Sequence, residues 1–341
     1  MKKNKVIKII TIIIVVILIL IGIVSGIIYF YINNKLNKIN KVDVDLNNIT
    51  INEEVKEKLT GYRNIALFGI DTRSDDYGLG NRSDCIIIAS INNDTKEVKL
   101  VSVYRDSYLE IPNRGLDKVT HAYSFGGAEL ALSTLNSNLD LNMTEFITVN
   151  FDAVAEIVNS LGGVEIDITP EEVGYLKSYT YATAQSTGIA SSVITEAGKH
   201  NLDGVQAVAY SRIRYTAGGD YKRTERMRTV LTAIVEKAKT KNISELNKLM
   251  DTLLPRIYTN IDKSEILSLL PEAMSYSITD SIGWPYEVDG GKISGIWYGV
   301  PSNLENNVSR LHQELFPNEN YEPSQKVKEI SQKIINKTGR T

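Results

Sequence analysis

The chain opens with a strongly apolar stretch unlike anything that follows it. Four lysines within the first eight residues precede an uncharged run over 9–34 that is rich in Ile, Val and Leu. As a helix, the run from Ile9 to Ile32 would be about 36 Å long, enough for a bilayer core of about 30 Å. It is too long for a cleaved signal peptide, and it ends in aromatic residues at 29–31, which suit a membrane interface. The pattern predicts an uncleaved transmembrane helix.

The lysines also predict the orientation of this helix. Lysines flank both ends of the run, but the N-terminal group is the stronger, so the N-terminus should be cytoplasmic and the rest of the chain outside. We therefore expect a single-pass protein of the cell membrane. Its predicted parts are a cytoplasmic head at 1–8, a membrane helix at 9–34, a stalk at 35–60, an extracellular domain at 61–318 and a polar C-terminal tail at 319–341.

Beyond residue 60, short apolar runs alternate with amphipathic helical patterns. Buried strands are predicted at 64–70, 85–91 and 97–104, and the last two should form a hairpin. Polar loops are expected at 71–84 and 105–121, and a weakly patterned surface excursion at 169–197. The remaining predictions are helices at 128–139, 152–161, 205–213, about 220–239, 243–254, 263–274 and 302–316, strands at 146–150 and 164–168, and a hairpin within 283–301 around Asp289-Gly290-Gly291. This alternation predicts an α/β domain with α-β-α layers, in which helices flank a mixed sheet.

Composition and charge exclude several classes of function. The net charge is −3, which argues against general binding of nucleic acid, so any anion site must be local. Cys85 is the single cysteine and lies in an apolar run, where a buried small side chain is expected. The three histidines are far apart and show no metal-binding spacing, so a zinc site is not expected.

One stretch, Ser211–Arg228, is strongly basic. Guanidinium groups suit phosphate oxygens, and Gly218-Gly219 followed by Asp220 has the pattern of a turn into a helix start, where the dipole favours anions. The alternative is an ordinary solvated basic helix. The six basic residues of the stretch are Arg212, Arg214, Lys222, Arg223, Arg226 and Arg228.

Charged loops follow two of the predicted strands. Carboxylates without Cys or His partners suit a hard cation such as Mg²⁺, which is often shared with phosphates. The alternative is ordinary loop carboxylates paired with arginines. The first loop contains Asp71, Arg73, Asp75, Asp76, Arg82 and Asp84, and the second begins with Arg105 and Asp106.

Taken in order, these phrases resemble the LytR–CpsA–Psr family of bacterial cell-wall proteins. The matching segments are NIALFGIDTR, NRSDCIII, VSVYRDSYLEIP, DKVTHAYSFGG, LGGVEI, LDGVQAVAYSRIR and GGDYKRTERMR. The resemblance implies a membrane-anchored phosphotransferase that moves a glycopolymer from a polyprenyl-pyrophosphate carrier onto peptidoglycan through a phosphodiester. It also implies an apolar tunnel for the polyprenyl tail, with membrane lipid and peptidoglycan as partners and no nucleic acid.

The resemblance assigns roles to particular residues. It implies Asp71 and Asp84 as ligands of Mg²⁺, with Mn²⁺ as an alternative metal. The implied catalytic residues are Arg105 and Asp84. The residues themselves leave two roles open for a third candidate, Asp106, which is either the general base in place of Asp84 or a salt-bridge partner of Arg105. The implied pyrophosphate-binding residues are Arg73, Arg105, Arg212, Arg214, Arg223 and Arg226, supported by Asp220 and Lys118.

The chain departs from the family pattern in two places. Met227 stands where glutamine is usual, so a hydrogen bond at that point is in doubt. The loop between Asp71 and Asp84 is lengthened, so Asp75 or Asp76 could replace a metal ligand. Two other functions stay open at this point: a membrane-bound attenuator or sensor of transcription, and a pyrophosphatase that uses the same site with water as acceptor.

Overall fold

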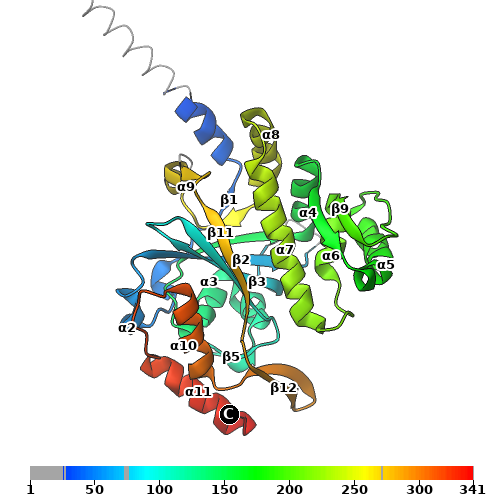
Figure 1. Cartoon of the computed structure of the whole chain (residues 1–341). Helices are drawn as coiled ribbons and strands as arrows, with labels where there is room; N and C mark the ends of the chain where they lie inside the picture. Colours follow the sequence, from blue (N-terminus) through cyan, green and yellow to red (C-terminus); the bar gives the residue numbers. More distant parts are fainter. Residues whose placement is uncertain (1–25, 27, 73–76, 270–271, 341) are drawn as a thin grey trace, which may run out of the picture.

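The computed structural model describes residues 26, 28–72, 77–269 and 272–340. At its centre lies a seven-stranded mixed sheet in the order β1-β10-β7-β2-β3-β4-β11 (Figure 1). β2 pairs with β7 in parallel and β4 pairs with β11 in parallel, whereas β3 is antiparallel to both of its neighbours. The strands are β1 (Asn40–Lys41), β2 (Tyr62–Ile70), β3 (Ser83–Asn92), β4 (Glu97–Val103), β7 (Glu145–Asn150), β10 (Tyr258–Thr259) and β11 (Ser277–Trp284).

Side chains of the central strands alternate between the two faces of the sheet, as a period of two requires. On one face Phe68, Ile86, Ile88 and Val101 are buried with α3 (Thr120–Leu139), α10 (Leu304–Leu315) and α11 (Gln325–Thr338). On the other, Ile87 and Leu100 pack with Leu231 of α7 (Gly219–Lys239). The sheet is therefore covered by helices on both faces, which confirms the predicted mixed α/β architecture.

A lobe beside α7 has its own apolar cluster. It joins α4 (Phe151–Ser160), α5 (Pro170–Thr187) and α6 (Gly204–Arg212) with the strand pair β8 (Val164–Ile168) and β9 (Gly198–Leu202). The expected surface excursion at 169–197 is largely α5, which begins with a capping box between Thr169 and Glu172. The weak apolar pattern of α5 concealed this helix in the sequence.

Several smaller elements complete the domain. The expected loop at 105–121 contains a hairpin, and the hairpin expected around Asp289 turns instead at Ser294-Gly295, where both residues have positive φ. These elements are β5 (Tyr108–Ile111), β6 (Gly115–Lys118), β12 (Val288–Ile293), β13 (Ile296–Pro301), α2 (Glu53–Lys56), α8 (Ile243–Leu253) and α9 (Lys263–Leu269), with short 3₁₀ turns at Leu46–Asn48 and Leu254–Arg256.

The segment 35–60, expected to be a stalk, is part of the folded domain. Leu36 packs with Leu254, Leu59 lies in the main core, and β1 pairs with β10 at the edge of the sheet. Lys35 and Lys38 both form ion pairs with Asp251 on α8, with nitrogen–oxygen distances of 2.6 and 2.8 Å. Its polar composition hid the few apolar side chains that anchor it.

The C-terminal tail, expected to be polar, also packs into the domain. Val327, Ile330 and Ile334 of α11 are at most 2% exposed and belong to the main core. Asp140, at the end of α3, accepts hydrogen bonds from the Tyr321 hydroxyl at 2.6 Å and the Ser324 backbone N–H at 2.8 Å. These contacts join the end of the chain to the centre.

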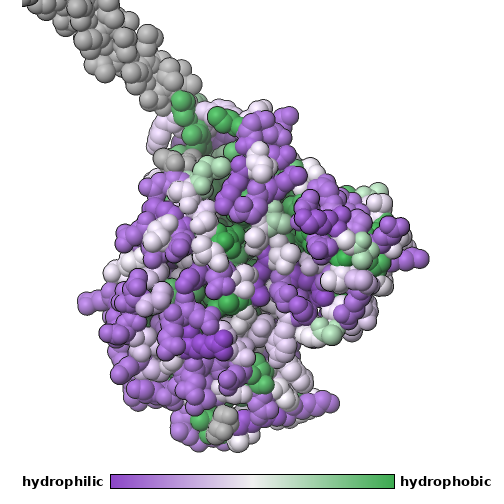
Figure 2. Space-filling model, in the orientation of Figure 1, coloured by the Kyte–Doolittle hydropathy of each residue, from purple (hydrophilic) through white to green (hydrophobic). Residues whose placement is uncertain are grey.

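Of the expected transmembrane helix at 9–34, only residues 26 and 28–34 are described. Within the described part, no helix has the length and apolar character needed to cross a membrane. Residues 28–36 are helical and expose large apolar side chains at Ile28, Tyr29 and Phe30. Figure 2 shows apolar residues where this helix meets a domain surface that is otherwise mostly hydrophilic.

Candidate active site

The predicted charged residues gather at one edge of the sheet. β2 ends at Ile70 and β3 begins at Ser83, and these two residues are register partners. β4 is antiparallel to β3, so the end of β4 lies at the same edge. Asp71, Asp84 and Arg105 are thereby brought together, although they are distant in sequence.

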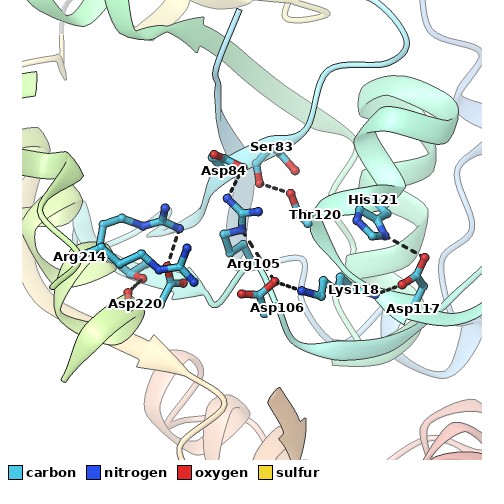
Figure 3. Close-up of polar contacts among 12 residues, drawn as sticks. Ser83, Asp84, Arg105, Asp106, Asp117, Lys118, Thr120, His121, Arg214 and Asp220 are labelled. Carbon is cyan, nitrogen blue, oxygen red and sulfur yellow. Dashed lines mark hydrogen bonds and ion pairs between the residues drawn. The ribbon is translucent and has the colours of Figure 1, made fainter. Parts of the chain in front are cut away.

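Arg105 and Asp84 form a partly buried ion pair at the centre of this edge (Figure 3). Arg105 Nη1 lies 2.6 Å from Asp84 Oδ1, and the side chains are 17% and 19% exposed. Burial raises the pKa of Asp84 above its usual value. The charges of Arg105 and Arg223 lower this pKa, while those of Asp71 and Asp220 raise it, so all five groups are close enough to interact.

The start of α7 brings the second set of charges to the same place. Gly218 has a φ of 88° and allows the chain to turn into the helix. Asp220 Oδ1 then lies 2.7 Å from Arg223 Nη2 and 3.6 Å from Arg214 Nε (Figure 3). Arg223 is only 11% exposed, whereas Arg214 is 48% exposed, so Arg223 lies inside the cluster and Arg214 lies at its rim.

Asp106 lies behind Arg105 and is held by a lysine. Its Oδ1 is 2.7 Å from Lys118 Nζ and 3.9 Å from Arg105 Nε, and its side chain is 8% exposed. Lys118 reaches Asp106 from the end of β6, within the hairpin that the sequence analysis missed (Figure 3). The adjacent Asp117 accepts a hydrogen bond from the Lys118 backbone N–H and pairs with His121 Nδ1 at 2.8 Å.

Three of the buried or partly buried arginines keep a donor without a protein partner. Among the described residues, no hydrogen bond is made by Arg105 Nε, Arg223 Nε or the neighbouring Arg228 Nη1. A buried N–H group without an acceptor costs about 1–3 kcal/mol. An oxyanion at this edge of the sheet would supply the missing acceptors.

Arg226 does not join this cluster. Its side chain is 5% exposed, and its three nitrogen atoms donate to Glu172, the Ile213 carbonyl and Thr216 at 2.7, 3.0 and 2.7 Å. The structure therefore gives Arg226 the role of bracing the turn between α6 and α7, in place of the expected pyrophosphate contact. Glu172 is far from Arg226 in sequence, so no local pattern could have revealed this pair.

Other predicted residues lie at the margin or outside the description. Arg212 lies over the Phe151 ring, 5.3 Å from its centroid, and donates a long hydrogen bond of 3.4 Å to Thr183. Arg73, like Asp75 and Asp76, lies outside the described residues. Met227, at the position usual for glutamine, is buried at 7% exposure and contributes no hydrogen-bonding amide.

Sequence reasoning missed a further layer beneath the cluster. Arg228 donates from Nε to Ser281 Oγ on β11 at 2.8 Å, and burial lowers its pKa. The Tyr104 and Tyr221 rings are tilted at 59° to each other, with centroids 4.4 Å apart. Burial raises the pKa of the Cys85 thiol to about 12, so Cys85 is not a thiolate nucleophile at neutral pH. Only the position of Arg228, in the basic stretch, hinted at this layer.

The fold and site define an α/β protein that holds arginines and carboxylates together where β2 and β4 end and β3 begins, an arrangement suited to an anionic ligand. The profile of the LytR_cpsA_psr family matches residues 27–313. The chain belongs to this family.

Relatives and solved structures of similar sequence agree with this assignment. The chain is 32% identical to the polyisoprenyl-teichoic acid–peptidoglycan teichoic acid transferase TagU of Oceanobacillus iheyensis over 276 residues, 78% of each chain. It is 36% identical to TagU of Enterococcus faecalis over 202 residues, 58% of this chain and 61% of that relative.

Two solved structures share the fold. That of gbs0355 from Streptococcus agalactiae has a TM-score of 0.63 at 26% identity, over 81% of this chain and 94% of that one. TagT bound to LIIa-WTA has a TM-score of 0.56 at 26% identity, over 82% of this chain and 92% of that one.

Proposed function

We propose that this protein transfers an anionic glycopolymer from a polyprenyl-pyrophosphate carrier onto peptidoglycan through a phosphodiester bond. The observation that carries the proposal is the pair of buried arginines, Arg105 and Arg223. Each is held by a carboxylate, and each keeps an Nε donor that no described residue accepts. The names of the TagU relatives describe a transferase of this kind.

A pyrophosphate suits this set of donors. Its oxygens are strong acceptors, and charge-assisted bonds from guanidinium groups are about twice as strong as neutral ones. Arg105 and Arg223 are fixed by Asp84 and Asp220, so they need little reorganisation when an anion binds. Arg214, which is 48% exposed, adds a third positive charge at the rim of the cluster.

The apolar part of the carrier has a candidate entry beside the site. Leu79 is 67% exposed and Phe125 is 39% exposed, and the Gly80 N–H donates to the Ser124 carbonyl at 2.9 Å, which ties the loop to α3. The helix is kinked directly after Phe125, where Gly127 has a φ of 64°. A polyprenyl chain would find apolar surface here next to the charged edge of the sheet.

Asp71 and Asp84 fit a Mg²⁺ or Mn²⁺ ion only as part of a larger ligand set. Within the described residues, no three His, Cys, Asp or Glu side chains are grouped so as to hold a metal. The two aspartates do interact, because the charge of Asp71 raises the pKa of Asp84, and their oxygens suit a hard cation. When bound with a pyrophosphate, such a cation would supply further neutralisation of its charge.

The residues present support a direct displacement at phosphorus. A peptidoglycan hydroxyl attacks the phosphorus that carries the glycan, and a new P–O bond forms. The bond from this phosphorus to the bridging oxygen breaks, and polyprenyl phosphate leaves with the electron pair while Arg105 and Arg223 neutralise its charge. The hydroxyl proton passes to a carboxylate.

Asp84 suits the role of base better than Asp106. Burial raises the pKa of Asp84, which makes its carboxylate a stronger base, and its side chain is 19% exposed. Both carboxylates are ion-paired, Asp84 with Arg105 at 2.6 Å and Asp106 with Lys118 at 2.7 Å, but Asp106 is only 8% exposed, so a substrate hydroxyl reaches Asp84 more easily. We therefore assign the proton to Asp84 and a positioning role to Asp106.

Product analysis with Arg223 variants tests the proposal. The full-length protein in detergent would receive a polyprenyl-pyrophosphate-linked glycopolymer, Mg²⁺ and uncross-linked peptidoglycan. We expect a phosphodiester-linked product, and a loss of about 100-fold or more in rate for Arg223→Ala. Arg223→Lys should recover little activity, because lysine lacks the fork that contacts two oxygens.

The adjacent Lys222 provides the matched control. It is about half exposed and pairs with Glu225 at 2.9 Å, so Lys222→Ala removes a nearby charge without touching the cluster. This variant should keep nearly full activity. Release of free glycopolymer phosphate in place of the linked product would instead identify a pyrophosphatase, and full activity of Arg223→Ala would refute the assigned role.

A further inference from the structure

The hairpin of β12 and β13 begins at the candidate active site. The backbone N–H of Gly299 on β13 donates to the Asp106 carbonyl at 2.9 Å, and Gly299 also forms a bridge with Ser107. The hydroxyl of the preceding residue, Tyr298, donates to Asp117 at 3.3 Å. The base of the hairpin is thus fixed to the loop that follows β4, and its strands run outward from there.

One face of this hairpin is covered by the protein. Tyr298 packs against Tyr108 with ring centroids 4.8 Å apart. Arg340, at the end of the chain, donates to the Asp289 carbonyl at 2.8 Å and lies where a side chain on Gly291 would be. Around Tyr298 and Gly291, this face of the hairpin therefore packs against the rest of the domain.

The opposite face carries Trp297, which is 42% exposed. Gly290 and Gly299 are register partners on this face. A Cβ on Gly290 would lie 2.8 Å from Trp297 Cζ2, and one on Gly299 would lie 3.6 Å from Cη2. The indole therefore lies across the glycine pair, with backbone beneath it.

The position of this ring relates it directly to the site. A Cβ on Gly299 would also be 3.7 Å from the Asp106 carbonyl oxygen, so the edge of the indole ends close to Asp106. Gly290 therefore lies inside β12, where a bulkier residue would displace the ring, and the turn falls at Ser294-Gly295. The exposed face of the Trp297 indole is therefore a flat aromatic surface beside the candidate active site.

We propose that Trp297 is the platform of an acceptor subsite, on which a pyranose ring of a peptidoglycan glycan strand stacks. This inference rests on the proposed function. The face of an indole is negative, so it attracts the weakly positive C–H groups on the flat side of a sugar ring. Because the glycine pair already fixes the indole, little conformational entropy is lost on binding.

The location of the hairpin favours a wall glycan over a membrane. Figure 1 shows the hairpin at the end of the domain opposite the helix that leads to the N-terminal segment. A strand lying on Trp297 would extend along the hairpin toward Asp106 and place a following hydroxyl near the arginine cluster. A bilayer at the N-terminal end would not reach this ring.

Binding of a defined sugar tests the platform without requiring transfer. The full-length protein in detergent would be titrated calorimetrically with a β-1,4-linked N-acetylglucosamine hexamer. We expect Trp297→Leu to weaken binding about tenfold and Trp297→Phe to weaken it less, because a smaller ring remains. Ile296→Ala, which removes a 53% exposed apolar side chain at the same hairpin, is the matched control and should bind normally.

Kinetics and fluorescence add independent readouts. In the transfer assay, Trp297→Leu should raise KM for the acceptor glycan about tenfold while KM for the polyprenyl-pyrophosphate donor stays unchanged. Trp284, the other tryptophan, is fully buried, so a sugar-induced change in the wild-type emission reports on Trp297, and the emission of Trp284 in the variants reports on folding.

The outcomes separate this inference from the proposed function. Equal binding of the hexamer by the wild type and both Trp297 variants would overturn the platform, even if transfer were demonstrated. Binding that depends on Trp297 would support it, even if no transfer or hydrolysis occurred. Trp297-dependent attachment to lipid vesicles, or Trp297-dependent dimerisation, in place of sugar binding would assign this face to another occupant and overturn the inference.

Discussion

Arg105, Arg223 and their carboxylate partners illustrate how single residues prepare this site. Asp84 and Asp220 hold the two guanidinium groups at 2.6 and 2.7 Å, and the Nε donor of each arginine stays available. Fixing the donors in advance lowers the reorganisation needed when an anion binds. The same arrangement buries Asp84, which costs stability because burial disfavours its charged form.

Asp84→Asn should therefore separate function from stability. The folded-state pKa of Asp84 is raised, so the wild type loses stability as pH rises from the unfolded pKa through the folded one. Asparagine is neutral at every pH and avoids this loss. Relative to the wild type, the variant should thus become more stable between pH 4 and pH 7, while transfer falls about 100-fold or more.

Urea denaturation at the two pH values measures the first effect, and the phosphodiester product measures the second. A difference in unfolding free energy between variant and wild type that stays constant or falls from pH 4 to pH 7 would contradict the argument. Ser90→Ala, which changes a buried side chain farther along β3, is a control for general effects of substitution in this strand.

The metal ligands can be tested at the same scale. Two aspartates offer too few oxygens for the octahedron that Mg²⁺ requires, whereas pyrophosphate oxygens can complete it. We expect weak Mg²⁺ binding by the protein alone and much tighter binding with a polyprenyl-pyrophosphate analogue. Calorimetry of both states measures this. Unchanged binding by the Asp71→Asn/Asp84→Asn double variant would show that these aspartates are not ligands.

At the scale of elements, the C-terminal helices α10 and α11 pack with α3 on one face of the central sheet. His312 of α10 is 1% exposed, stacks on Tyr321 with centroids 3.6 Å apart, and contacts the Leu139 carbonyl through Nε2 at 2.9 Å. Asp140, the next residue after α3, accepts hydrogen bonds from the Tyr321 hydroxyl and the Ser324 backbone N–H. The ends of α3 and α10 and the start of α11 therefore form one buried polar junction.

Acid should weaken this junction through His312. Burial lowers its pKa from 6.5 to about 4, so the unfolded chain binds the proton more readily than the folded one as pH falls below 6.5. The wild type should lose about 2 kcal/mol of stability from this residue by pH 5. His312→Gln, which cannot take up that proton, should show a smaller loss between pH 7 and pH 5.

Urea midpoints at pH 7 and pH 5 measure the difference. His200→Gln, a change of the same kind at a partly exposed position on β9, is the control for the substitution itself. An identical decrease for the wild type and His312→Gln would exclude His312 as its source.

At the scale of the whole molecule, the chain before β1 is joined to the domain by ion pairs. Lys35 and Lys38 share Asp251, and the Tyr31 hydroxyl donates to Asn247 at 2.7 Å, so the helix over 28–36 leaves the domain in a defined direction. The lysines before residue 9 predict that the N-terminus is cytoplasmic and the domain outside. We propose this single-pass topology for the full chain.

Protease accessibility tests the topology. Protease added to intact, wall-stripped cells should digest the domain, whereas a cytoplasmic marker protein should survive until the cells are lysed. Complete protection of the domain before lysis would reverse the proposed orientation.

The sequence by itself determined the strands and the main ligand-binding candidates. β2, β3 and β4 follow from apolar runs and turn residues, and Arg105 and Arg223 follow from charges placed after a strand and at a helix start. These signals are local: the period of a strand and the cap of a helix depend on neighbouring residues. The segments that resemble the family added the metal-binding and pyrophosphate-binding roles that local chemistry alone left open.

Only the tertiary structure decided which charges are free and which segments are buried. Arg226 is bonded internally because Glu172 reaches it from α5, and α11 is part of the core because Val327 and Ile330 join the main apolar cluster, where α11 packs on α3, α10 and β5. Gly290 of β12 supports Trp297 because β13 lies beside it. Each of these outcomes depends on contacts between residues far apart in the chain. A side chain is buried only once those contacts form, and its burial then shifts its pKa and limits which groups it can pair with.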